Sequence, residues 1–178
     1  MTKKIVRPGG LKTVFTDEGL IVRSSGKLIE GVTVRRAKVI SDERGRLGEI
    51  FRADDPWFEK FGQVYFTTTY PGVVKAWHYH KKQTDHFYVV KGMLKVALYD
   101  ERKDSPTYGT VNELYIGEHC PGLVRIPPGV QHGWMCVSQS EAYIVNVVSE
   151  TYNYADPDEF RTPPHDNHIP YDWTRKDG

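Results

Sequence analysis

A succession of short β-prone runs constrains the fold of this chain more than any other feature. Runs rich in Val, Ile, Tyr, Phe and Thr alternate with Gly, Pro, Asp and Asn positions, a pattern typical of strands joined by turns. Roughly nine such strands predict an antiparallel barrel or sandwich. We expect strands at residues 32–40, 48–53, 63–70, 73–80, 86–90, 93–100, 110–116, 123–127 and 141–149. Short helices are expected only near 14–19 and 55–61, and Gly92 predicts a tight hairpin between two runs.

The length of the chain fits one domain. A chain of 178 residues can bury one hydrophobic core but hardly two, so we expect a single domain over 1–178. The core is expected at about 32–150. The tail, 151–178, is rich in Tyr, Pro, Asp and His and too polar for a core strand, so it is expected to wrap the barrel or a neighbouring subunit.

Charge and hydropathy favour a small-molecule or protein partner. The 24 basic and 23 acidic residues nearly cancel to +1, which argues against nucleic acid and anionic membrane as partners. No run approaches the roughly 20 apolar residues that span a bilayer, and MTKKIVRPGG lacks the apolar core of a signal peptide. Cys120 and Cys136 show no metal or disulfide spacing and are expected to be buried thiols. The expected location is therefore cytoplasmic.

Two histidines separated by one residue mark the expected site. His78 and His80 project from the same face of a predicted strand. Asp85 or His86 can join them from the next strand, and His132 can reach them if the chain folds back. Imidazoles with a carboxylate suit a divalent metal, and they equally suit a general base with its orienting partners. The residues themselves leave both chemistries open.

The spacing of these residues resembles the two motifs of the cupin superfamily. The first motif is matched by Gly72, His78, His80, Asp85 and Gly92, and the second by Pro127, Gly129 and His132. Aspartate stands at Asp85 where the superfamily usually has glutamate. The resemblance implies an all-β fold, the cupin double-stranded β-helix or jelly-roll barrel, with an irregular C-terminal tail.

A closer resemblance extends from about Val32 to Trp173. The segments DERGRLGEIF, GQVYFTT, GVVKAWHYH, VVKG, DERKDSPTYG, IPPGVQHGW and HIPYDW are similar to the dTDP-4-dehydrorhamnose 3,5-epimerase family. HYHKKQTDHF and IPPGVQH also resemble the metal-binding cupin domains of capsular polysaccharide synthesis enzymes. Both groups handle nucleotide-activated sugars. The resemblance implies an isomerase that epimerises a 4-keto-6-deoxyhexose next to its carbonyl, with a nucleotide-diphosphate sugar as substrate.

The epimerase resemblance also implies catalytic roles. His78 stands where the family has the general base that removes the proton α to the keto group. Lys75 replaces a family arginine, and together with His132 it is expected to stabilise the enolate or position the keto group. The family's tyrosine acid aligns with Val145, and Tyr143, two residues away on the same strand face, is the candidate for that role.

Further matches imply substrate contacts. Arg44 and Glu49 fall in an element that resembles the family's RGxFxE, in which the arginine helps to hold the nucleotide diphosphate. Gln63 matches a polar residue of the pocket. Val96 stands where the family has an aspartate that orients the base, so one expected partner of His78 is absent from its usual position.

Asp85 stands where the family has a lysine, and this difference supports a second interpretation, a metal site. With His78, His80 and His132 it forms a ligand set for a divalent ion, zinc or else iron, manganese or nickel. A ligating His78 cannot also be a free base, because its lone pair is committed. The alternative functions are therefore a metal-binding cupin with keto-isomerase or oxygenase activity, or an inactive sugar-nucleotide-binding protein. A homodimer is expected, with residues 11–22 able to add a strand to a neighbour.

Overall fold

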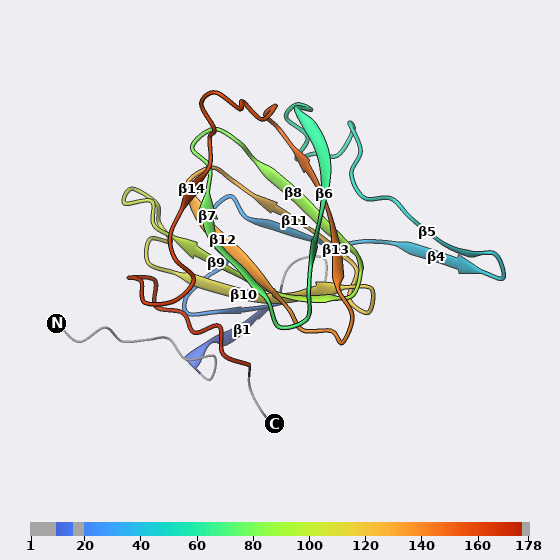
Figure 1. Ribbon diagram of the computed structural model, residues 1–178, viewed down its shortest axis with the longest axis horizontal. Helices are drawn as coiled ribbons and strands as arrows, with labels where there is room; N and C mark the ends of the chain where they lie inside the picture. The colour runs from blue at the N-terminus through green and yellow to red at the C-terminus, as the bar shows by residue number, and fades with distance from the viewer. Residues whose placement is uncertain (1–9, 16–19, 176–178) are drawn as a thin grey trace.

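Two antiparallel sheets face one another and enclose the core (Figure 1). The computed structural model describes residues 10–15 and 20–175, so the predictions that fall on 1–9, 16–19 and 176–178 lie outside it. The larger sheet runs in the order β1 (Lys12–Phe15), β2 (Ile21–Ser24), β10 (Val111–Gly117), β9 (Met93–Asp100), β12 (Val130–Cys136), β7 (Val74–Tyr79) and β14 (Phe160–Arg161). The smaller sheet runs β3 (Thr33–Arg36), β11 (Gly122–Ile126), β8 (Asp85–Lys91), β13 (Ala142–Val148) and β6 (Gln63–Thr69). The predicted all-β jelly roll is confirmed.

A separate hairpin stands away from the barrel. It consists of β4 (Val39–Asp42) and β5 (Gly45–Gly48), which pair only with each other. Figure 1 shows this hairpin, here called the arm, projecting from the side of the two sheets. Its side chains are mostly exposed, because no other part of the described chain covers them.

The core lies between the two sheets and follows the alternation of strand side chains. Along β13, Ala142 and Ile144 point into the core and Val148 is buried on the same face, whereas Tyr143 and Val145 point outward. Inward side chains of the larger sheet, such as Leu98 and Leu114, meet those of the smaller sheet, such as Phe87. Each fully buried side chain of this size contributes roughly 1.5–3 kcal/mol. This apolar packing fixes the sheets on which the site is built.

Gly92 does not form the predicted hairpin. It has a φ of +74°, as a tight turn requires, but the strands on either side of it do not pair. β8 lies in the smaller sheet and β9 in the larger, so Gly92 turns the chain from one sheet to the other. A Cβ there would lie 2.9 Å from the Cα of Ala142, so the corner also needs glycine for space. Asp85 therefore meets the histidines across the barrel interior, not from a neighbouring strand.

Some predicted boundaries are also wrong. The run 32–40 divides into β3 and β4, and 48–53 is irregular after the end of β5. β12 was not predicted, because VQHGWMC shows no alternation, yet all seven of its residues are buried. A strand buried on both faces has no polar face, which explains the missing signal.

The predicted helices are not present in the described residues. The segment 55–61 makes turns in place of a helix, and the Asp55 carboxylate accepts a 2.5 Å hydrogen bond from Arg35. Of 14–19, the first two residues belong to β1 and the others are not described. No described helix is long and apolar enough to cross a bilayer.

The C-terminal tail lies against the barrel of its own chain. β14 pairs with β7 at the edge of the larger sheet. Beyond it, Ile169, Tyr171 and Trp173 pack with Trp77 on the outer face of that sheet. The Tyr171 hydroxyl donates a 2.6 Å hydrogen bond to the buried carboxylate of Glu113. The tail thus covers one sheet and, before that, contributes to the wall of the main cavity.

Candidate functional site

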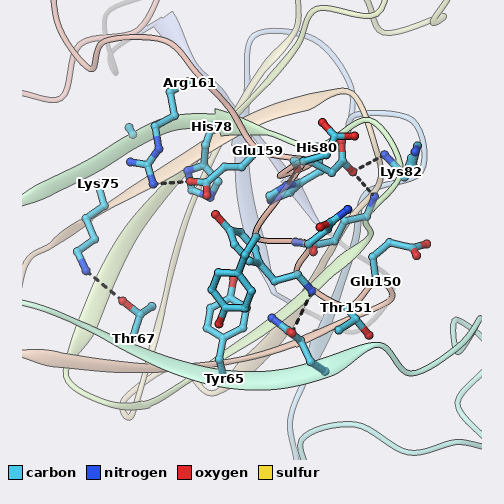
Figure 2. A pocket seen from close by; sticks show the side chains of 18 of the residues that line it. Tyr65, Thr67, Lys75, His78, His80, Lys82, Glu150, Thr151, Glu159 and Arg161 are labelled. Atoms are coloured by element: carbon cyan, nitrogen blue, oxygen red, sulfur yellow. Dashed lines mark hydrogen bonds and ion pairs between the residues drawn. The ribbon is translucent and has the colours of Figure 1, made fainter.

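A cavity of about 1030 Å³ opens between β6, β7 and the tail (Figure 2). β7 belongs to the larger sheet and β6 to the smaller, and Lys75 of β7 bridges them by donating a 3.0 Å hydrogen bond to Oγ1 of Thr67 on β6. The polar and aromatic part of the wall includes Gln63, Tyr65, Thr67, Lys75, His78, His80, Lys82, Gln83, Trp134, Glu150, Thr151, Tyr152, Asn153, Tyr154, Asp156, Asp158, Glu159 and Arg161.

His78 presents an uncommitted imidazole to this cavity. It is half-buried, and neither ring nitrogen has a hydrogen-bond partner among the described residues. Its ring centroid lies 4.0 Å from that of His132 and 5.4 Å from the nearest Trp134 ring centroid. Burial, and next the neighbouring His132, hold the pKa of His78 well below its usual value. The imidazole is therefore neutral at neutral pH, with a lone pair free to accept a proton.

Asp85 lies behind the histidines at the start of β8. Its Oδ2 is 3.1 Å from Nε2 of His132 and 3.3 Å from Nε2 of His80. Its Oδ1 accepts hydrogen bonds from Nε2 of Gln83 at 2.9 Å and Nδ2 of Asn146 at 3.0 Å. Burial alone would raise the pKa of Asp85, but the hydrogen bonds from His132 and His80 outweigh it and hold the pKa well below its usual value. Asp85 is therefore a buried, fully satisfied anion.

His80 and His132 are each held by a backbone carbonyl on the side away from Asp85. Nδ1 of His132 donates to the carbonyl of Val130 at 2.9 Å, and Nδ1 of His80 donates to the carbonyl of Asp158 at 2.5 Å. Both rings consequently turn Nε2 toward Asp85. Burial would lower the pKa of His80, but Asp85 reverses this effect and raises it.

The predicted metal ligands are brought together. One ring nitrogen from each of His78, His80 and His132 lies within 4.8 Å of the others, and Asp85 contacts two of them. Histidines that ligate metals commonly donate their second N–H to a backbone carbonyl, as two of these histidines do. The donor set and its tautomers therefore fit a divalent ion.

Asp158 of the tail fixes the turn that follows β7. Its carboxylate accepts three successive backbone N–H groups, from Lys81 and Lys82 at 2.8 Å and from Gln83 at 3.1 Å. These bonds outweigh burial and lower the pKa of Asp158. Because its carbonyl also holds His80, Asp158 ties the orientation of that ring to the position of the tail.

One side of the cavity is cationic. Nζ of Lys75 also donates to the carbonyl of Thr68 at 2.6 Å, and burial, with Arg161 nearby, lowers the pKa of this lysine. Arg161 lines the same wall and pairs with Glu159. Figure 2 shows both cations beside His78. These two cations suit anionic oxygens of a ligand.

The predicted substrate contacts separate into two groups. Gln63 and Lys75 line the cavity. Arg44 does not, because it lies in the turn of the arm, paired with Asp42. Glu49 follows the arm and pairs with exposed Arg52, also outside the wall.

Two predicted catalytic residues lie off the cavity wall. His132 is buried behind His78, where it contacts Asp85. Tyr143 points outward from β13, and its hydroxyl donates a 2.7 Å hydrogen bond to Glu141. The alternation of β13 explains this orientation, since its neighbours Ala142 and Ile144 face the core.

Several wall residues were not predicted. Tyr65 carried a usable signal, because a strand that places Gln63 in the cavity also places Tyr65 there. Asn146, which lies behind the wall between Tyr65 and Asp85, could have been found from the same alternation on β13. Asp158 and Arg161 carried no comparable signal, because their positions depend on how an irregular tail folds back over the barrel.

Comparison with known proteins places this site in a family. The family model described as dTDP-4-dehydrorhamnose 3,5-epimerase matches residues 27–178. The spore coat polysaccharide biosynthesis protein SpsL of Bacillus subtilis (strain 168) is 40% identical over 146 residues, which span 82% of this chain and 97% of that protein. The probable low-salt glycan biosynthesis epimerase Agl13 of Haloferax volcanii is 44% identical over 147 residues, spanning 82% and 94%.

A solved structure agrees. The crystal structure of a dTDP sugar isomerase from Desulfovibrio desulfuricans G20 superposes with a TM-score of 0.78 at 32% identity, covering 84% of this chain and 94% of that one. The family match extends over most of the sequence, and two relatives exceed 30% identity over four-fifths of it. The chain therefore belongs to the dTDP-4-dehydrorhamnose 3,5-epimerase family and is a sugar-nucleotide epimerase with a cupin jelly-roll fold.

Proposed function

We propose that this protein inverts one or both of the carbons that flank the keto group of a nucleotide-activated 4-keto-6-deoxyhexose. The observation that carries the proposal is the neutral, uncommitted imidazole of His78 on the wall of a cavity with a cationic side. A hydrogen on a carbon next to a carbonyl is acidic enough for such a base to remove. The family relatives named above support the same reaction class.

His78 begins the reaction. Its lone pair takes the proton from the carbon next to the carbonyl, and the C–H electrons move to the carbonyl oxygen to give an enolate. Lys75 supplies positive charge to that oxygen, together with the N–H that it does not donate to Thr67 or Thr68. Buried His132, packed against His78, keeps the base in place. Return of a proton to the opposite face of the same carbon gives the inverted sugar.

The rest of the wall suits the nucleotide. Arg161 can bind the diphosphate, and Gln63 adds an amide. Tyr152 and Tyr154 stand at the wall with ring centroids 4.9 Å apart, and the Tyr154 residue is 90% exposed. An exposed aromatic ring at the mouth of a cavity can stack on a nucleobase.

We infer a homodimer from the arm. Ile40 and Leu47 on the arm are 55% and 63% exposed, which is unfavourable unless another surface covers them. Arg44 and Glu49 lie on or beside this arm and do not line the cavity of their own chain. If these two residues contact the substrate, they must do so in the cavity of a second copy. Free Cys120 and Cys136 agree with a reducing, cytoplasmic location.

A divalent ion is a second candidate for the same site. His78, His80, Asp85 and His132 would hold it, and the carbonyl-held tautomers of two of these histidines favour this arrangement. Such an ion, when bound, supplies a Lewis acid that polarises the sugar carbonyl. The two arrangements exclude each other at His78, because a ligating nitrogen has no lone pair for a proton.

The function is tested by incubating the protein with dTDP-4-keto-6-deoxyglucose in deuterated water. We expect deuterium at C3 or C5 together with an inverted product, both visible by NMR. Elemental analysis of the same preparation separates the two arrangements. Less than about a tenth of an equivalent of metal, with activity unaffected by a chelator, supports the free base, whereas about one equivalent with chelator-sensitive activity supports the ion.

A further inference from the structure

Inversion requires a proton donor on the face of the sugar opposite the base, and Tyr143 lies outside the cavity. We propose that Tyr65 of β6 is this donor. The inference rests on the epimerase function proposed above, and it concerns a residue that the sequence comparison did not indicate.

Tyr65 and His78 approach the cavity from different sheets. β6, which carries Tyr65, is the edge strand of the smaller sheet, and β7, which carries His78, belongs to the larger sheet. Figure 2 shows the two side chains extending from their separate strands toward the same space. A sugar ring between these strands therefore has His78 on one side and Tyr65 on the other, as two-sided proton transfer requires.

The hydrogen bonds around Tyr65 leave its own proton free. Nδ2 of Asn146 lies 3.0 Å from Oδ1 of Asp85 and 2.8 Å from the hydroxyl of Tyr65. An ionised carboxylate only accepts hydrogen bonds, so the group that faces Asp85 must be the NH₂ of Asn146. The amide oxygen accordingly accepts the backbone N–H of His86 at 3.1 Å. The second N–H of the amide is then donated to the phenol oxygen.

This arrangement orients the phenol for donation. Because its oxygen accepts from Asn146, and no described residue accepts its hydrogen, the O–H is directed to a ligand in the cavity. Burial raises the pKa of Tyr65, so the phenol is protonated at neutral pH. Tyr152 and Tyr154 also line the cavity, but no hydrogen bond to a described residue orients their hydroxyls.

Tyr65, His78 and water account for every proton that moves in this reaction. In the second half of the reaction the enolate electrons return to carbon, a C–H bond forms on the face opposite His78, and the O–H bond of Tyr65 breaks. The imidazolium of His78 then gives its proton to water, and the phenolate of Tyr65 takes one from water. The net change is inversion at carbon, with both side chains restored.

Tyr65→Phe separates proton removal from inversion. Wild type, Tyr65→Phe and Tyr143→Phe are each incubated in deuterated water with a panel of nucleotide-activated 4-keto-6-deoxyhexoses. Deuterium next to the carbonyl reports removal and return of the proton by His78, and the epimer formed reports the donor. We expect Tyr65→Phe to lower epimer formation at least about 100-fold while deuterium exchange stays within a few-fold of wild type. Tyr143→Phe should keep the wild-type ratio of epimer formation to deuterium exchange.

Three results would overturn the assignment while leaving the function intact. The first is epimer formation by Tyr65→Phe at the wild-type rate. The second is an equal loss of deuterium exchange and inversion in Tyr65→Phe while its melting temperature stays at the wild-type value. The third is a lowered ratio of epimer formation to deuterium exchange in Tyr143→Phe. A wild-type protein that neither exchanges nor inverts any sugar of the panel overturns the proposed function, and the role of Tyr65 with it.

Discussion

Asp85 is the charge around which the site is arranged. Its two oxygens contact His80, His132, Gln83 and Asn146, so a fully buried anion has a partner on every side. An uncompensated buried charge would destabilise the fold by several kcal/mol, which explains why so many donors converge here. The same anion fixes the two histidine rings and the Asn146 amide, and through that amide it orients Tyr65.

A second buried carboxylate, Asp100, stabilises the loop that contains DSPTYG. It accepts hydrogen bonds from Nε of Arg102 at 2.8 Å and from the hydroxyls of Ser105 and Thr107 at 2.6 Å. Burial alone would raise its pKa, but Arg102 and the two hydroxyls outweigh burial and lower the pKa to about 2. Because the folded pKa lies below the unfolded value, the stabilisation is complete above about pH 4 and is lost as the pH falls through about 2.

We therefore expect Asp100→Asn to lower the free energy of unfolding by about 2 kcal/mol at pH 7 and by about half as much at pH 3. Urea unfolding at the two pH values measures the difference. Asp54→Asn, which changes an exposed ion pair with Arg52, is the matched control and should have little effect at either pH. An equal loss at both pH values for Asp100→Asn would contradict the low pKa.

Asp158 gives a prediction for the turn after β7. Asp158→Ala removes the acceptor of three backbone N–H groups and should lower the free energy of unfolding by about 1–3 kcal/mol. KM should rise, because the tail that carries Arg161 loses this attachment. Asp158→Asn, which keeps one acceptor oxygen, should lie between Ala and wild type. Wild-type KM and stability in the alanine variant would show that the tail is held elsewhere.

At the scale of elements, the tail is a strap that pairs with β7 through β14 and is held by side chains before and after that strand. Its first part is attached through Asp158, and its last part through Tyr171 and Trp173, whose carbonyl accepts a 2.9 Å hydrogen bond from Lys95. The strap closes one wall of the cavity and covers the outer face of β9 and β10. Residues far apart in sequence thus build a single cavity wall.

Tyr171→Phe tests the second attachment. The substitution leaves the buried Glu113 carboxylate without its 2.6 Å hydroxyl donor, so the free energy of unfolding should fall by about 1–3 kcal/mol. Tyr108→Phe, at a residue 54% exposed, should stay within about 0.5 kcal/mol of wild type. If the two substitutions have equal effects on urea unfolding, the hydroxyl of Tyr171 does not anchor the strap.

The local sequence pattern predicted the positions of most strands, but it did not predict the sheet to which each strand belongs. β6, β7, β9 and β13 were predicted within one or two residues because alternation and β-propensity are properties of neighbouring residues. The corner at Gly92 has the same local signature as a hairpin, so sequence could not tell that β8 and β9 part there. The histidines and Asp85 were predicted through motif spacing, whereas Asp158 and Arg161 depend on long-range packing of an irregular segment.

At the scale of the whole molecule, the arm is one of the described regions that leave large apolar side chains exposed, in its case Ile40 and Leu47. If it forms the homodimer contact, the protein should have twice the 20.4 kDa mass of the chain by light scattering. Leu47→Glu should shift that mass toward 20.4 kDa without unfolding the barrel, because Leu47 contributes nothing to the core. A wild-type mass equal to one chain, or a dimer insensitive to this substitution, would remove the arm from the interface.

The central claim is that His78 removes the sugar proton. The most direct measurement is the deuterium content of a nucleotide-activated 4-keto-6-deoxyhexose recovered from metal-free deuterated buffer after treatment with wild type or His78→Asn. The account predicts deuterium next to the carbonyl with wild type, and at least about 100-fold slower incorporation with His78→Asn, because both ring nitrogens of the other histidine on the described wall, His80, are engaged by Asp85 and Asp158. Incorporation by His78→Asn at the wild-type rate would contradict the account.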